Sequence, residues 1–237
     1  MIGINYASEN MTKSQLVCME SAKKHGCDEF YCFDRLSLPF SFEWQNKEIF
    51  SQSRGNGYWL WKPYILLHKM MASNEGEIIV YLDSGVEVVN SLNYIKDRMQ
   101  GDIWLFGNEH RHTDWCKGDV LHKMLKSDDF EGWDERQVQA SVIFVKNTPF
   151  ARNFVKEWLL WCQMPNFIDD SPSISPNVAS FKEHRHDQAI LTNLAIRYNI
   201  PLHWWPTQYG HSIKHLYPKD DYPQLFNHHG LRNNGNR

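Results

Sequence analysis

The sequence has few cysteines and no long apolar run. Its five cysteines are an odd number in a chain of 237 residues, and none of them stands in a CxxC pair. This argues against a disulfide scaffold or a cysteine zinc site and favours a reduced, intracellular protein. The apolar runs are too short to cross a membrane, and the first residues have neither a charged stretch nor an apolar leader. We therefore expect a cytoplasmic protein without a transmembrane segment, whose contact with membranes would be peripheral.

An excess of positive charge is also missing. The formal net charge is -3 with the histidines neutral, and lysine and arginine form no block. Proteins that bind nucleic acid by neutralising its phosphates carry such blocks, so no nucleic-acid partner is expected. The Walker phosphate loop, GxxxxGK[ST], is absent as well.

Aromatic residues, in contrast, are abundant. They make up 14% of the chain, with ten tryptophans, within a hydrophobic content of 42%. A chain of this length and composition builds an ordinary globular core, and most of these rings are expected to fill it. Trp59, Trp61, Trp115 and Trp205 are also candidates for stacking on a sugar or a base.

Strand patterns alternate with helix patterns along the chain, which predicts an α/β fold with right-handed crossovers between parallel strands. Two helix starts have cap residues: Thr12 with Gln15 has the form of a capping box, and Thr148 precedes Pro149. Residues 163–182 are rich in Pro, Ser, Asn and Asp and are expected to form a binding loop or lid. The expected strands are 2–6, 29–33, 77–82, 103–106, 141–145 and 202–205.

The strand at 77–82 runs directly into a carboxylate, Asp83, followed by Ser84 and Gly85 and then by Glu87. Its continuous apolar run is typical of a strand covered on both faces. Ligands of open α/β sheets bind at the carboxyl ends of the strands, and paired carboxylates suit Mg²⁺ or Mn²⁺. The alternative is a turn in which Asp83 bonds only to its own backbone.

Three other groups of residues could meet a ligand with a metal-bound diphosphate. A histidine of the tail, His228 or His229, could add an imidazole to the metal. Arg54, with glycines at 55 and 57, could approach an oxyanion. Asp187 and Gln188 begin a helix, where a carboxylate is favoured. A fourth group, residues 5–7 and Asp34, lies at the ends of the first two expected strands, where a nucleotide base could dock. Each of these groups also has an ordinary structural explanation, as a cap or an exposed tail.

Five segments taken in order resemble small glycosyltransferases of the GT-A fold, the nucleotide-sugar transferases of bacterial capsule and lipopolysaccharide clusters and of some large DNA viruses. The resemblance covers most of the chain, from about Arg54 to His229, and implies a Rossmann-like, mixed, mainly parallel sheet flanked by helices. It also implies one domain over 1–237, with a nucleotide-sugar half to about residue 107 and an acceptor half, with the C-terminal tail, from about 108. The segments are RGNGYWLWKPY, YLDSGVE, SVIFVKNTPFARNFVKEWL, RHDQAIL and NHHG.

The resemblance also implies roles for individual residues. Asp83 matches the first Asp of the DxD element that holds a divalent cation on the donor. The third position is Gly85, so Glu87, His228 and His229 are the candidate metal co-ligands. Asp187 and Gln188 match residues that border the reacting sugar. Asp187 is the first candidate for a general base, and Asp119 is the second. Residues expected to bind the donor are Asn5, Tyr6, Ala7, Arg54, Gly57, Tyr58, Trp59, Lys62, Tyr81, Leu82, Asp83 and Ser84.

The implied activity is transfer of a sugar from a UDP-sugar to a hydroxyl of a glycan or glycoconjugate acceptor, assisted by Mn²⁺ or Mg²⁺, in polysaccharide biosynthesis. A non-catalytic carbohydrate- or nucleotide-binding protein on a decayed transferase fold is the alternative, and Gly85 is its main support. A nucleotidyltransferase would have a Gly-rich loop with a basic residue after the first strand, and residues 5–10 contain none.

Overall fold

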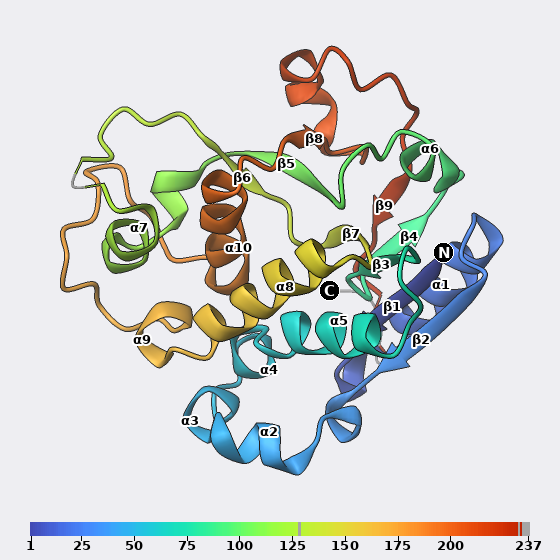
Figure 1. Ribbon diagram of the computed structural model, residues 1–237, viewed down its shortest axis with the longest axis horizontal. Coiled ribbons are helices and arrows are strands. Elements are labelled where there is room, and N and C mark those ends of the chain that lie inside the picture. The colour runs from blue at the N-terminus through green and yellow to red at the C-terminus, as the bar shows by residue number, and fades with distance from the viewer. Residues whose placement is uncertain (128, 232, 234–237) are drawn as a thin grey trace.

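The computed structural model describes residues 1–127, 129–231 and 233, and its centre is a seven-stranded sheet (Figure 1). Along the sheet the strands follow the order β2, β1, β3, β7, β5, β6, and β8 pairs with β5. The pairings of β1 with β2 and β3 and of β5 with β8 are parallel, whereas β7 is antiparallel to both β3 and β5. Among the described residues, all strands of this sheet except β6 and β7 therefore run in one direction. The predicted mixed, mainly parallel α/β sheet is confirmed.

The predicted strands are present, and the sequence pattern missed three short ones. β5 also continues to Arg111, beyond the predicted end at residue 106. β4 and β9 form a separate antiparallel pair, and neither they nor β6 were predicted, because three residues are too few to show a periodicity. The strands are β1 (Ile2–Tyr6), β2 (Glu29–Phe33), β3 (Ile78–Leu82), β4 (Val86–Val88), β5 (Ile103–Arg111), β6 (Arg136–Val138), β7 (Val142–Lys146), β8 (Leu202–Trp204) and β9 (Phe226–His228).

The helices cover the sheet on two faces (Figure 1). Four 3₁₀ turns connect them to the strands: η1 (Glu9–Met11), η2 (Arg35–Ser37), η3 (His112–Trp115) and η4 (Gly210–Leu216). The α-helices are α1 (Thr12–Lys24), α2 (Phe40–Gln45), α3 (Lys47–Phe50), α4 (Gly55–Tyr58), α5 (Trp61–Met71), α6 (Asn93–Lys96), α7 (Gly118–Leu125), α8 (Pro149–Cys162), α9 (Pro165–Ile168) and α10 (His186–Arg197). None of the described helices is both long and apolar enough to span a bilayer.

Two apolar clusters, one on each face of the sheet, make the core. Ile79 and Tyr81 of β3 join the cluster under α5, α8 and α10, whereas Val80 and Leu82 join the cluster under α1 and the C-terminal segment. The alternation confirms that β3 is buried on both faces, as its continuous apolar run predicted. A strand fixed in this way gives a rigid base for the residue that follows it, Asp83.

One of the two predicted helix caps is correct. The Thr148 side chain accepts a hydrogen bond from the Ala151 N–H at 3.2 Å and caps α8. The capping box at Thr12 is wrong, because Thr12 is already the first residue of α1 and its hydroxyl donates to Asn233. Gln15 instead donates to the Asn5 side chain at 3.1 Å. Both side chains are thus used in contacts outside the first turn of α1.

Candidate functional site

A cavity of about 610 Å³ opens beside the carboxyl ends of β1 and β3. Its fourteen described lining residues come from the segment after β1, the segment around α4, the turn after β3 and the end of the tail. The volume lies in the usual range of small-molecule sites. Asp83 is the only acidic residue among the fourteen, and none of them is Lys or Arg. The cavity therefore combines one carboxylate with polar and aromatic groups.

The Asp83 carboxylate is held on one side only. Tyr81, two residues earlier on β3, donates its hydroxyl to Asp83 Oδ1 at 2.5 Å, and Lys62 Nζ lies 3.4 Å from the same oxygen. Burial, followed by the charge of Asp83, raises the pKa of Tyr81 well above its usual range, so the phenol stays a donor. The backbone N–H of Asp83 donates to Ser141 O at 2.7 Å and ties the residue to the strand next to β3. These contacts leave Oδ2 as the oxygen able to meet a ligand.

A buried lysine joins Asp83 to the second predicted carboxylate. Lys62, on α5, is 3% exposed, and its ammonium lies 3.2 Å from Asp187 Oδ2 and donates to Ala140 O at 3.0 Å. Burial works to lower the pKa of Lys62, but the charges of Asp187 and Asp83 outweigh it and raise that pKa. The Lys62 ammonium thus lies between two carboxylates, Asp83 and Asp187, that are far apart in the sequence.

Asp187 itself lies below the cavity surface. It is 3% exposed, and its Oδ2 receives no well-directed hydrogen bond, so its contact with Lys62 is an ion pair set by distance alone. Burial raises the pKa of Asp187 to about 6, Lys62 opposes this rise, and Asp83 adds to it. Gln188 is bound inside the fold as well, donating to Gln137 Oε1 at 2.8 Å and accepting from the Ala140 N–H at 3.2 Å. Neither residue is part of the cavity lining.

The tail brings its histidines to the same cavity. β9 pairs with β4 so that His228 lies opposite Val86, and the His229 N–H donates to Gly85 O at 3.0 Å. Burial lowers the pKa of His228 and of His229, with Asp83 opposing the shift at His228 and Glu87 opposing it at His229. Both imidazoles are therefore neutral at neutral pH, the form that binds metals. Both ring nitrogens of His229 are shielded from solvent and have no hydrogen-bond partner among the described residues.

These residues offer part of a metal site. Asp83, His228 and His229 all line the cavity, whereas Glu87, on the same short strand as Val86, does not. Among the described residues, no group of three or more His, Cys, Asp or Glu side chains lies close enough to share an ion. A carboxylate oxygen and imidazole nitrogens suit Mn²⁺, and the other positions would fall to water and to ligand oxygens. The donor set fits a cation that arrives with a phosphorylated ligand.

The glycine segment after Arg54 forms a left-handed turn. Residues 55–59 all have positive φ, and three of them, Asn56, Tyr58 and Trp59, are not glycine. Each such residue costs about 1–2 kcal/mol, and strain of this kind gathers at functional sites. Trp59 lines the cavity, whereas the Tyr58 ring stacks on His186 with the centroids 4.7 Å apart. The Trp59 ring also lies near His186, with the centroids 5.4 Å apart, so the turn packs two aromatic rings against one imidazole. The positive φ expected at glycines 55 and 57 is confirmed.

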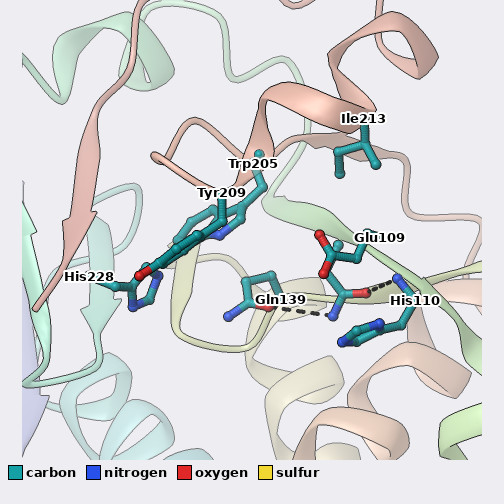
Figure 2. A pocket seen from close by; sticks show the side chains of 9 residues that line it. Glu109, His110, Gln139, Trp205, Tyr209, Ile213 and His228 are labelled. Atoms are coloured by element: carbon teal, nitrogen blue, oxygen red, sulfur yellow. Dashed lines mark hydrogen bonds between the residues drawn. The ribbon is translucent and has the colours of Figure 1, made fainter. Parts of the chain in front are cut away.

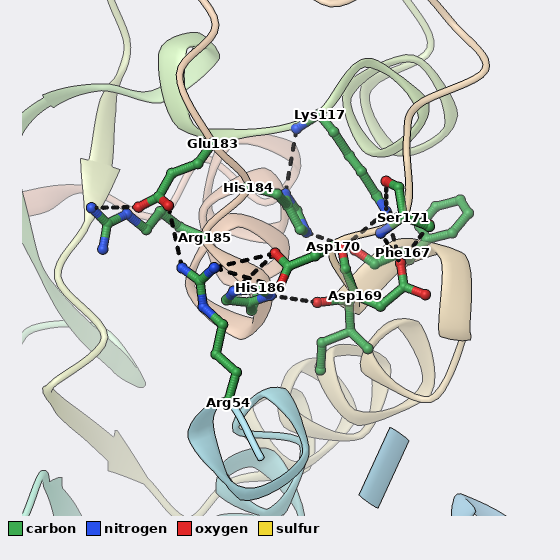
Figure 3. A network of polar contacts seen from close by, with 11 residues as sticks. Arg54, Lys117, Phe167, Asp169, Asp170, Ser171, Glu183, His184, Arg185 and His186 are labelled. Atoms are coloured by element: carbon green, nitrogen blue, oxygen red, sulfur yellow. Dashed lines mark hydrogen bonds and ion pairs between the residues drawn. The ribbon is translucent and has the colours of Figure 1, made fainter. Parts of the chain in front are cut away.

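Arg54 is held by acids outside the cavity (Figure 3). Its guanidinium lies 3.4 Å from Asp170 and 3.3 Å from Glu183, and it does not line the cavity. The structure therefore does not bring Arg54 to Asp83, because two carboxylates of the 163–183 region hold its charge. The arginine instead ties the left-handed turn to that region, and His186 Nε2 lies 3.6 Å from the same Asp170.

The other predicted site residues divide between the cavity and the core. Tyr6 and Ser84 line the cavity, and Tyr6 stacks on Trp61 with the centroids 3.9 Å apart. Asp119 lies elsewhere, where its carboxylate accepts the backbone N–H groups of residues 174 and 175. Buried residues behind the cavity surface are Asn5, Ala7 and Leu82. The linking role of Lys62 was missed, although the helical spacing of Lys62 with the apolar Ile65 and Leu66 indicates that it lies on the buried face of α5.

No known protein-family profile and no curated protein matches the sequence. Solved structures do match. Mouse xyloside xylosyltransferase 1, in its apo form, is similar at 10% identity over 96% of this chain and 97% of its own, with a TM-score of 0.50. The bifunctional glycosyltransferase WbbM, also apo, is similar at 12% identity over 98% of this chain, with a TM-score of 0.56. The chain spans 46% of that WbbM chain. These similarities show the fold, and the GT-A class predicted from the motifs is confirmed.

Proposed function

We propose that this protein is a glycosyltransferase that moves a sugar from a nucleoside-diphosphate sugar, with UDP as the nucleotide, to a hydroxyl of a glycan acceptor. One observation carries the proposal. Asp83, fixed at the carboxyl end of a doubly buried strand, lines one cavity together with His228 of the tail, on a sheet of the GT-A fold. In open α/β sheets such strand ends are where ligands bind.

The charge of the cavity favours a donor that arrives with a divalent cation. A diphosphate placed beside Asp83 would meet a like charge, and no Lys or Arg among the described lining residues offsets it. Asp83 and one of the tail histidines, His228 or His229, would hold Mn²⁺ or Mg²⁺ there, and its charge would offset this repulsion. Bound there, the cation supplies Lewis-acid stabilisation of the charge on the leaving diphosphate. The aromatic wall of Tyr6, Trp59 and Trp61 offers faces to the base or the sugar.

The protein's own charged groups position the site. Tyr81 and Lys62 fix Asp83 Oδ1, which presents Oδ2 to the cavity. Asp187 acts through Lys62, because its ammonium lies between the two carboxylates and Asp187 is buried. The role that this geometry favours for Asp187 is therefore to position the lysine. Catalytic contact of Asp187, Gln188 or Asp119 with the reacting sugar stays a prediction.

Nucleotide release from a panel of nucleotide sugars, with Mn²⁺ and with EDTA, tests the function. We expect release with at least one UDP-sugar, and loss of that release in EDTA. Asp83→Asn keeps an oxygen for the Tyr81 hydroxyl but removes the charge, so Mn²⁺-dependent UDP affinity should fall by roughly tenfold or more. Asp97→Asn is the matched control, because Asp97 is exposed at the end of α6 and does not line the cavity.

The outcomes separate the transferase from its main alternative. Failure of every donor to release nucleotide, together with no binding of UDP in the presence of metal, would refute the proposed function. Binding of glycans without nucleotide affinity would instead support a non-catalytic carbohydrate-binding protein. Equal UDP affinity in wild type and Asp83→Asn would place the metal site elsewhere.

A further inference from the structure

A second hollow, of about 340 Å³, adjoins the cavity at His228 (Figure 2). Its walls come from the end of β5, from Gln139, and from the segment that leads into η4. His228 is the residue that lines both spaces. We propose that the second hollow binds one neutral sugar unit of the acceptor, an inference that rests on the proposed transferase function.

Aromatic rings form the apolar side of the hollow. Trp205 is 4% exposed and is fixed by stacking on Phe226, with the centroids 5.4 Å apart. Tyr209, in contrast, is 64% exposed, so its ring adds an open apolar surface to the hollow. Their centroids lie 5.4 Å and 6.3 Å from that of His228. One rigid ring and one exposed ring around an imidazole offer apolar faces to the C–H groups of a pyranose.

Fixed amides and a carboxylate form the polar side (Figure 2). Asn108 accepts the His110 N–H at 2.9 Å and donates to Gln139 Oε1 at 3.4 Å, while Gln139 donates to Ser141 Oγ at 2.9 Å. Each amide NH₂ therefore has a second N–H to donate, and the exposed Glu109 carboxylate is an acceptor. Donors and acceptors opposite an aromatic face are the groups that recognise sugar hydroxyls.

The charge of the hollow selects the kind of sugar. Among its described lining residues Glu109 is the only acid, and none is Lys or Arg. Burial lowers the pKa of His110, so its imidazole is neutral at neutral pH. A uronic acid, a sialic acid or a phosphate would meet Glu109, and no Lys or Arg of the described lining would offset the repulsion. The lining therefore suits a neutral sugar.

The shared wall explains how such a sugar would take part in transfer. The polar chain from Asn108 through Gln139 ends at Ser141, whose carbonyl accepts the Asp83 N–H at 2.7 Å. Because His228 lines both spaces, a sugar between Tyr209 and the amides would lie next to the donor cavity. One of its hydroxyls would then reach past the edge of that imidazole to the anomeric carbon of the donor, and the diphosphate would leave as the new bond forms.

Acceptor kinetics test this assignment, with 4-nitrophenyl hexosides as neutral probes and 4-nitrophenyl glucuronides as acidic ones. We expect neutral hexosides to speed nucleotide release and the glucuronides to do so far less. Tyr209→Ala should raise the KM for the neutral acceptor by roughly tenfold or more. Tyr94→Ala is the control, since Tyr94 is an exposed tyrosine on α6 that does not line the hollow. Glu109→Gln should narrow the difference in nucleotide-release rate between the neutral and the acidic probe.

Saturation-transfer NMR with the same glycosides reports binding independently of turnover. Neutral hexosides that contact wild type but not Tyr209→Ala would support the site. Equal acceptor KM and equal binding in wild type and Tyr209→Ala, with nucleotide release intact, would overturn this inference while the transferase function stands. Absence of nucleotide release from every donor would overturn the transferase function, and with it the acceptor role, even where sugar binding depends on Tyr209.

Discussion

Replacing Lys62 by methionine removes the one cation between Asp83 and Asp187. Methionine keeps most of the length and packing of the side chain, so the change is mainly one of charge. Lys62 is 3% exposed and Asp187 is 3% exposed, which means that water cannot take over the role of the ammonium. Breaking a buried pair by removing one partner costs about 3–5 kcal/mol of unfolding free energy, because a buried charge is left alone.

The cost should depend on pH through Asp187. Its folded-state pKa of about 6 is already above the ordinary 3.8, so the wild type itself loses stability as pH rises between these values. Without Lys62 that pKa rises further. Each unit of the rise adds about 1.4 kcal/mol to the deficit at high pH, which is the unfolding free energy that the variant has lost relative to wild type. At pH 5 Asp187 is mostly protonated in both proteins. The deficit of the variant should therefore be full at pH 8 and smaller at pH 5, by about 1–3 kcal/mol.

Urea denaturation followed by tryptophan fluorescence, at pH 5 and at pH 8, measures the two deficits. Lys69→Met is the matched control. Lys69 lies on the same helix, is 8% exposed, and places its ammonium 3.4 Å from the centroid of the Tyr31 ring. Because a phenol does not titrate between pH 5 and 8, the deficit of this control should be the same at both values. A Lys62→Met deficit that is equally independent of pH would refute the ion-pair reasoning.

Two further substitutions test the parts that shape the site. Gly57→Ala should destabilise the protein by at least about 1 kcal/mol more than Gly76→Ala in urea denaturation, since a Cβ at Gly57 would lie 2.8 Å from the Phe50 side chain and a Cβ at Gly76 would meet nothing. Both positions have positive φ, so equal losses would mean that backbone strain alone matters. Asp119→Ala should speed proteolytic cleavage near residues 174–175, whose N–H groups the carboxylate holds, and unchanged cleavage would contradict that anchoring role.

The sequence was a good guide wherever a local pattern determines the structure. The doubly buried strand before Asp83, the glycines of the turn at 55 and 57, and the Thr148 cap each depend on a few neighbouring residues. Their patterns carry the physical cause directly: burial on both faces, positive φ, and an unpaired N–H in the first turn of a helix.

Contacts between distant segments could not be predicted in the same way. The pairing of β4 with β9 brings His228 to the turn after Asp83 across more than half of the chain, and each strand is only three residues long. Arg54 shows the opposite case. Its glycine context suggested an oxyanion ligand, but Asp170 and Glu183 hold it, and nothing in the local sequence shows those partners.

Lys62 and the proposed divalent cation would not compete for the same oxygen. Lys62 and the Tyr81 hydroxyl both face Asp83 Oδ1, so the carboxylate is oriented before any metal binds. A divalent ion can then bind through Oδ2 without displacing the lysine, whose charge stays shared with Asp187. Were Lys62 absent, the Tyr81 hydroxyl alone would hold Oδ1, and the orientation of the carboxylate would be less fixed. The buried Asp187–Lys62 pair is therefore best understood as a device that holds Asp83 in the orientation that the proposed function requires.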